Sequence, residues 1–264
     1  MATNLLSKPI NLAVEADTRP GCRNPLQDDL DIAKLAGLAV QYPAILDAIA
    51  SFVAHDVNEI GFTEDAKAAV KRSLLTIVPF EVARDGVNAL IAVADRFERE
   101  CEKGGRDRGK VAKDFSSGLC EAIIKGLMVN AHRNTAEIIS DARFSIGGRP
   151  INECNVDFFW AQPRREVAEI VECKNHPSWL CDPFAEWRAT GNKAKYKHSK
   201  IYMIDKVFSN LQEGNWQARV FCVTLRARWN IKRYLDRLLT PPPFLEILAL
   251  DDLQEGGFPQ PLGS

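Results

Sequence analysis

Three short apolar stretches follow one another between residues 136 and 174, and they constrain the fold more than any other feature of the chain. Glycines and a proline separate them, as is typical of strands joined by turns. The stretches are Ala136–Ile146, Ile151–Trp160 and Val167–Lys174, and the turns are Gly147-Gly148 and Gln162-Pro163-Arg164-Arg165. The pattern predicts a sheet whose second and third strands form a hairpin through Pro163.

The segments around these strands have longer helical periods and further short apolar runs. We expect helices at residues 114–131, 193–213 and 230–239, and strands at residues 217–225 and 244–250. The order of helix, three strands, helix, strand, helix and strand is typical of an α/β protein. The predicted fold class is therefore α/β, with a mixed sheet flanked by helices.

The first hundred residues have a different, helical pattern. After an irregular arm at residues 1–23, an Asn24-Pro25 start predicts a helix to about Gln41. Further helices are expected near Pro43, Thr63 and Asp85. The glycine-rich stretch at residues 103–110 indicates either an interdomain linker or a long surface loop. We therefore expect a helical N-terminal region at residues 1–110 and an α/β domain at residues 111–264.

The third strand of the trio ends in an unusual group of charges. Alternate residues of a strand share a face, so Glu172 and Lys174 project to the same side. The hairpin through Pro163 brings Asp157, near the end of the preceding strand, beside Glu172. Two carboxylates offer the hard oxygen ligands that Mg²⁺ prefers. A lysine beside them suits phosphodiester hydrolysis, because it can stabilise charge in the transition state. The competing interpretation is a salt bridge at a sheet edge.

These residues resemble the motif of the PD-(D/E)xK nuclease superfamily, which has the restriction-endonuclease-like fold. That motif has an acidic residue at the end of one strand and (D/E)-x-K on the next. Here the matching residues are Asp157 and, after fourteen intervening residues, Glu172-Cys173-Lys174. The core order of the family also matches residues 114–225. Val156 replaces the proline of the nominal motif, and the N-terminal region has no match.

The resemblance implies a Mg²⁺-dependent (endo)deoxyribonuclease in which Mn²⁺ can substitute. Asp157, Glu172 and Lys174 would be catalytic, and Asp157 and Glu172 would bind the metal. Glu121, on the helix before the first strand, would be a third metal ligand, with Glu137 as the substitute. DNA is the expected substrate because most of the family acts on DNA, and a role in restriction or antiviral defence follows by the same analogy. The alternatives are an RNA nuclease, or a catalytically inactive nucleic-acid-binding or assembly subunit with the same fold.

The formal net charge of −1 means that nucleic-acid binding must depend on local basic patches. Two stretches are candidates, and each is also compatible with a solvated surface. They are Lys193, Lys195, Lys197 and Lys200, and then Arg226 and Arg228. The near-neutral charge also leaves room for a regulatory protein partner or a homo-oligomer.

The chain is expected to be cytoplasmic. Its seven cysteines include no CxxC pair, which favours reduced thiols over disulfides or a zinc site. No secretion signal is visible at the N-terminus. The most apolar stretch, residues 35–54, is interrupted by Gln41, Pro43 and Asp47, so no membrane span is predicted.

Overall fold

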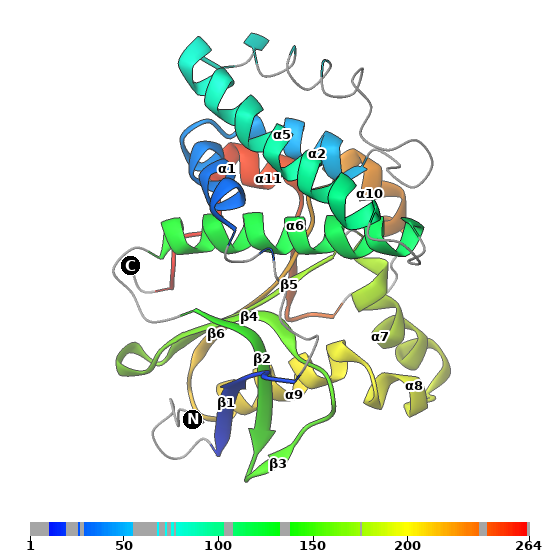
Figure 1. Cartoon of the computed structure of the whole chain (residues 1–264). Coiled ribbons are helices and arrows are strands. Elements are labelled where there is room, and N and C mark those ends of the chain that lie inside the picture. Colours follow the sequence, from blue (N-terminus) through cyan, green and yellow to red (C-terminus); the bar gives the residue numbers. More distant parts are fainter. Residues whose placement is uncertain are drawn as a thin grey trace.

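A seven-stranded mixed sheet with helices on both faces forms the centre of the fold, which is α/β as predicted (Figure 1). The computed structural model describes residues 11–19, 26, 29–54, 68, 72, 75–76, 78–102, 108–132, 138–174, 176–237 and 242–262. The strands are β1 (Leu12–Ala16), β2 (Ile139–Ile146), β3 (Arg149–Pro150), β4 (Val156–Gln162), β5 (Val167–Cys173), β6 (Gln217–Val223) and β7 (Leu245–Leu248).

The strand order is β1-β2-β4-β5-β6-β7, and β3 pairs with β2 outside this path. Neighbours from β1 to β5 are antiparallel, whereas β5, β6 and β7 are parallel. A 3₁₀ turn at Pro163–Arg165 joins β4 to β5. The hairpin predicted through Pro163 is therefore confirmed.

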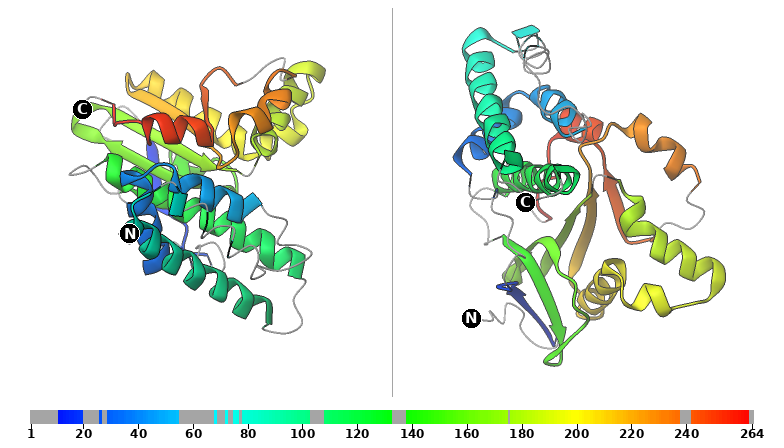
Figure 2. Two further views of the ribbon diagram at one scale, coloured as in Figure 1. Left: turned by 90° about the horizontal axis from the view of Figure 1, so that it is seen from above. Right: turned by 45° about the vertical axis from the view of Figure 1, so that its right-hand side comes forward.

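The helices lie in two groups on opposite faces of the sheet (Figure 2). They are α1 (Leu30–Gln41), α2 (Ile45–Ala54), α5 (Phe80–Glu102), α6 (Arg108–Ala131), α7 (Ser178–Thr190), α8 (Ala194–Lys197), α9 (Lys200–Glu213), α10 (Arg228–Leu235) and α11 (Leu250–Gly256). α6 covers one face of the sheet and α9 covers the other. Of the helices in the described residues, none is both long and apolar enough to cross a membrane.

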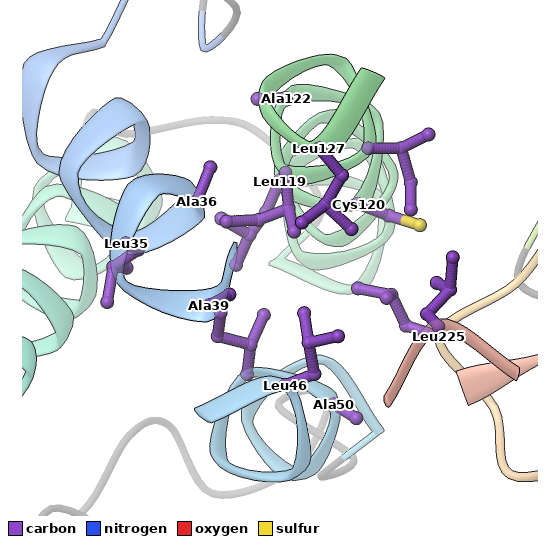
Figure 3. Close-up of a cluster of buried hydrophobic side chains, with 14 of the residues drawn as sticks. Leu35, Ala36, Ala39, Leu46, Ala50, Leu119, Cys120, Ala122, Leu127 and Leu225 are labelled. Atoms are coloured by element: carbon purple, nitrogen blue, oxygen red, sulfur yellow. The ribbon is translucent and has the colours of Figure 1, made fainter. Parts of the chain in front are cut away.

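Alternation along the strands produces a separate apolar core on each face. Phe158 and Val171 join the core formed with α1, α2, α5 and α6, and part of that core is shown in Figure 3. Their neighbours Phe159 and Ile170 join the core formed with α7 and α9. The first core runs without a break from the N-terminal helices to the sheet, so α6 is covered on both sides.

The N-terminal segment differs from the sequence-based expectation. The predicted irregular arm contains β1, which pairs antiparallel with β2 and buries Leu12 and Val14. The alternation spans only five residues, too few to be distinguished from a coil by pattern alone. α1 begins at Leu30, later than predicted, because the Asp29 carboxylate accepts hydrogen bonds from the first turn. Asn24-Pro25 lie outside the described residues.

Further differences concern helix boundaries. α7, which carries Trp179 and Trp187, follows β5 in a segment for which no helix was expected. The helix predicted from Lys193 is divided at Ser199, which caps α9 through a hydrogen bond from the Tyr202 backbone amide to its hydroxyl. α5 and α6 begin earlier than predicted, and α11 follows β7. The helix expected near Thr63 and the stretch 103–107 lie outside the described residues.

The contact between α1 and α6 depends on the absence of a side chain at Gly126. A Cβ added there would lie far inside the van der Waals radius of the Ala36 Cβ. Gly126→Ala should therefore reduce the free energy of unfolding by about 1–3 kcal/mol, because overpacking forces the helices apart. Gly37→Ala, on α1, meets no atom within 4 Å and is the matched control. It should stabilise the protein by roughly 0.5–1 kcal/mol. Urea denaturation measures both free energies of unfolding. An unchanged value for Gly126→Ala would contradict the close approach of α1 and α6.

Candidate functional site

Asp157 and Glu172 lie opposite each other on the adjacent strands β4 and β5. Phe158 pairs with Val171, so the next pair outward is Asp157 with Glu172. The Asp157 backbone amide donates to Glu172 Oε2 at 3.3 Å, and the Cys173 amide donates to Asp157 Oδ2 at 2.6 Å. Asp157 is 7% exposed and Glu172 is fully buried. The structure thus brings together the two carboxylates that the sequence singled out.

Two lysines provide positive charge beside this pair. Lys174 is anchored by a hydrogen bond from its amide to the Val223 carbonyl on β6 (2.9 Å), and its ammonium group donates to Glu172 Oε1. Lys200 is the first residue of α9, and its Nζ lies 2.5 Å from the same Glu172 oxygen and 3.7 Å from Asp157 Oδ1. Both lysine side chains are about a quarter exposed, at 26% and 23%. Two carboxylates and two ammonium groups therefore form one balanced cluster, called here the Glu172 cluster.

The cluster shifts the pKa values of its two carboxyl groups in opposite directions. Burial alone would raise the pKa of Glu172, but Lys174 and Lys200 outweigh it and leave that pKa below its usual value. Burial and the charge of Glu172 raise the pKa of Asp157, and the two lysines only partly offset this. Both lysines have a raised pKa, because the carboxylates more than compensate for burial. Glu172 is therefore the firmly ionised acid, and Asp157 is the first to take up a proton.

Sequence reasoning missed two residues at this site. Lys200 was assigned to a basic surface stretch, but the structure places it against both carboxylates. Asp141, on β2, lies opposite Asp157, and its pKa is raised to about 6 by burial first and by Asp157 second. The sequence signal for Asp141 is faint, an acidic residue within an apolar strand. Nothing in the sequence shows that α9 begins beside β5.

The predicted third metal ligand, Glu121, is partly buried on α6. Burial is the main cause of the raised pKa of the Cys120 and Cys173 thiols, and the charge of Glu121 adds to it. Cys173 belongs to the core on the α6 side of the sheet, whereas Glu172, one residue earlier on β5, projects to the other face. A ligand role for Glu121 stays a prediction. Glu137 lies outside the described residues.

The two basic stretches differ in the exposure and the ion pairs of their side chains. Lys193, Lys195 and Lys197 are exposed around α8, and Lys195 pairs with Glu186 at 3.0 Å. Arg226 is exposed after β6. The Arg228 guanidinium group instead pairs with Asp252, which ties α10 to α11.

Five cysteines of the chain are seen as free thiols. Cys120, Cys173, Cys181 and Cys222 are buried, and Cys154 is half-buried. Burial raises the pKa of the Cys120 and Cys181 thiols to about 12, which keeps both protonated. This arrangement agrees with the prediction of reduced thiols.

Comparisons with known proteins give little further information. No family model matches the chain, and no curated protein matches it. Among solved structures, the crystal structure of protein VC1899 from Vibrio cholerae aligns with 94% of this chain and 57% of its own, with 13% identity and a TM-score of 0.39. The chain thus spans little more than half of that protein.

The cluster predicts opposite effects for two isosteric substitutions in metal-free protein. Asp157→Asn should raise the melting temperature at pH 8, because it removes an acid whose ionised form is disfavoured in the fold. Since the pKa of Asp157 is raised, this gain should shrink as the pH falls and wild-type Asp157 becomes protonated. Glu172→Gln should cost about 1–3 kcal/mol, because Lys174 and Lys200 lose their charged acceptor.

Thermal melts in EDTA between pH 4 and pH 8 measure both effects. The cost of Glu172→Gln should persist over most of this range, because the lowered pKa keeps Glu172 ionised in the parent protein. Equal effects of the two substitutions at pH 8 would contradict the division of the carboxylates.

Proposed function

We propose that this chain is a divalent-metal-dependent nuclease that hydrolyses phosphodiester bonds, with DNA as its substrate. One observation carries the proposal. Asp157 and Glu172 face each other across β4 and β5, and Lys174 sits two residues beyond Glu172 with its ammonium group in the same cluster. The resemblance of these residues to the PD-(D/E)xK motif supports the assignment, and the choice of DNA rests on that resemblance.

The donor set fits Mg²⁺ or Mn²⁺. Mg²⁺ keeps several waters and needs only one or two protein carboxylates, which Asp157 and Glu172 would supply. When bound, the ion supplies positive charge that stabilises the phosphoryl oxygens. Glu172 Oε1 already accepts hydrogen bonds from Lys174 and Lys200. The lysines therefore compete with a cation for this oxygen, and at least one must shift to admit it.

Lys174 and Lys200 have the properties that phosphate chemistry requires. Their raised pKa values keep both ammonium groups charged at neutral pH, and their partial exposure leaves them open to a substrate. A lysine ammonium group released from Glu172 could neutralise negative charge that develops in the transition state.

The basic stretch before α9 would bind the phosphates of the substrate. Lys193, Lys195 and Lys197 are exposed and lead along the chain into Lys200, so positive charge continues from the surface to the Glu172 cluster. Lysine contacts with phosphates position a nucleic acid without reading its sequence. These lysines give the region before α9 a local positive charge, although the whole chain has a formal net charge of −1.

A second function is favoured by the balance of the cluster. Two carboxylates compensated by two lysines form a stable ion cluster without a metal, as expected of a non-catalytic nucleic-acid-binding or assembly subunit. The two functions differ in one assay. A nuclease cuts plasmid DNA with Mg²⁺ and stops with EDTA, whereas a binding subunit shifts DNA mobility without cutting. Labelled RNA in the same assay tests the RNA alternative.

Lys174→Ala should slow cleavage by about 10²–10³ fold, as expected when one positioned charge is lost from a transition state. DNA affinity should change little, because one ammonium group among several contributes little to binding. Single-turnover cleavage and fluorescence anisotropy measure the two quantities. Cleavage by Lys174→Ala at the parental rate would refute its catalytic role.

Charge reversal of Lys193, Lys195 and Lys197 together is the matched variant for substrate grip. It should weaken DNA binding and reduce the slope of log affinity against log salt by roughly 0.9 for each lost phosphate contact. The single-turnover rate at saturating DNA should stay near that of the parent. Lys200 is left unchanged in this set, since its ammonium group belongs to the Glu172 cluster. If the slope of log affinity against log salt is unaltered, DNA binds to another surface of the protein.

A further inference from the structure

Two of the five tryptophans differ from the others in their exposure. Trp179 is 70% exposed and Trp229 is 75% exposed. The other three are held in the fold, since Trp160 and Trp216 are buried and Trp187 stacks on a tyrosine ring with centroids 4.4 Å apart. Single exposed apolar side chains are common on protein surfaces. The placement of these two indoles therefore decides whether they have a function.

Both exposed tryptophans occupy the same position relative to two neighbouring parallel strands. Cys173 and Val223, the last residues of β5 and β6, are partners in the register. The helices that follow, α7 and α10, each begin five residues after their strand ends, and tryptophan is the second residue of each. Ligands of open α/β sheets bind beyond the carboxyl ends of such strands. The two indoles thus lie at the edge of the sheet where a ligand is expected.

This edge also carries the Glu172 cluster. The Lys174 amide donates to the Val223 carbonyl, so the ends of both strands meet at Lys174. Trp179 follows five residues later, and five residues span at most about 18 Å. Leu180, next to Trp179, is buried in the core on the α9 side of the sheet, which is the side of the Glu172 carboxylate. The start of α7 therefore lies within reach of the cluster.

Side-chain contacts hold α7 and α10 together. The Tyr234 hydroxyl of α10 donates to Asp182 Oδ1 of α7 at 2.8 Å, and the Tyr234 ring meets the His176 ring with centroids 5.0 Å apart. Asp182 lies three residues after Trp179 and so shares its side of α7. The two helices lie next to each other in both Figure 1 and Figure 2. The exposed indoles accordingly belong to one preformed surface.

Positive charge surrounds Trp229. Lys232 and Arg233 lie three and four residues after it, so they share its side of α10, and both are exposed. Arg226, three residues before it, is exposed as well. An apolar partner or a lipid surface would need a continuous apolar patch. Exposed aromatic rings among cations are instead typical of surfaces that bind single-stranded nucleic acid, where rings stack on bases and cations contact the backbone.

We propose that Trp179 and Trp229 stack on unpaired bases of the nucleic acid, while Arg226, Lys232 and Arg233 contact its phosphates. This inference rests on the proposed function and narrows its substrate class to strands that are unpaired next to the metal site. Bases within a duplex keep their faces inside the stack, where an indole cannot reach them. Stacking tolerates any sequence, because every base has a flat aromatic face.

Binding of a labelled oligothymidylate and of a duplex of the same length, both in EDTA, tests the inference without cleavage. Trp179→Ala and Trp229→Ala should each weaken oligothymidylate binding by roughly 5–100 fold, as expected for the loss of one stacked base. Duplex affinity should change little. The slope of log affinity against log salt should stay at the parental value, because no charge is removed.

Control variants separate stacking from general effects on the fold. Phe80→Ala removes another exposed ring, which is 65% exposed on α5 at the opposite face of the sheet, and should bind as the parent does. Trp179→Phe and Trp229→Phe keep an aromatic face and should recover most of the lost affinity. Thermal melts check that each variant is folded. If one alanine variant unfolds, the other alanine variant and the two phenylalanine variants still test the inference.

The outcomes separate this inference from the proposed function. Parental oligothymidylate affinity in both alanine variants would overturn the inference, and Mg²⁺-dependent cleavage by the parent would still support the nuclease. Equal losses for duplex and single strand would also overturn it. So would a parental dimer that both alanine variants abolish without a change in DNA binding, because the indoles would then join two copies of the chain. Selective loss of single-strand binding in a protein that cuts no DNA would support the inference and refute the nuclease.

Discussion

A fully buried glutamate in the middle of a sheet is the constraint on which the site depends. Glu172 needs compensating charge, and Lys174 on its own strand supplies only part of it. The remainder comes from Lys200, so the first turn of α9 must lie against β5. Ser199 caps that turn, and its carbonyl accepts a hydrogen bond from Asn152, which fixes the loop before β4 as well. One buried charge thereby links three separate parts of the chain.

Each face of β5 carries one buried carboxylate, and the two carboxylates have different partners. Glu169, on the α6 side, is held by His132 from the end of α6 and by Arg219 from β6. Arg219 also donates to the Gln260 carbonyl (2.6 Å), which brings the C-terminal segment over this pair. His132 is almost completely buried, whereas Lys174 and Lys200 are each about a quarter exposed. Arg219 is as exposed as Lys174, at 26%, but it is held by both Glu169 and the Gln260 carbonyl.

The helical N-terminal region serves the opposite face of the sheet. Its helices share a core with α6 and with sheet residues such as Phe158 and Phe221. That core lies on the far side of the sheet from α9, the helix that begins with Lys200 (Figures 1 and 2). The region thus stiffens the strands that carry the carboxylates without forming the wall of the site. β1 is the exception, since it extends the sheet beside β2, the strand of Asp141.

The sequence by itself determined the α/β class, the hairpin through Pro163 and the meeting of Asp157, Glu172 and Lys174. These features depend on local rules, because strand alternation and a short turn fix which neighbouring residues share a face. Tertiary structure alone decided the positions of Lys200 and Asp141. The first reaches the site through packing of α9 on the sheet, and the second through pairing of β2 with β4. The Lys200 contact joins residues 28 positions apart, and no local periodicity records which distant elements will pack together. Asp141 is only 16 residues from Asp157, but β3 lies between their two strands, so no single tight turn sets their register.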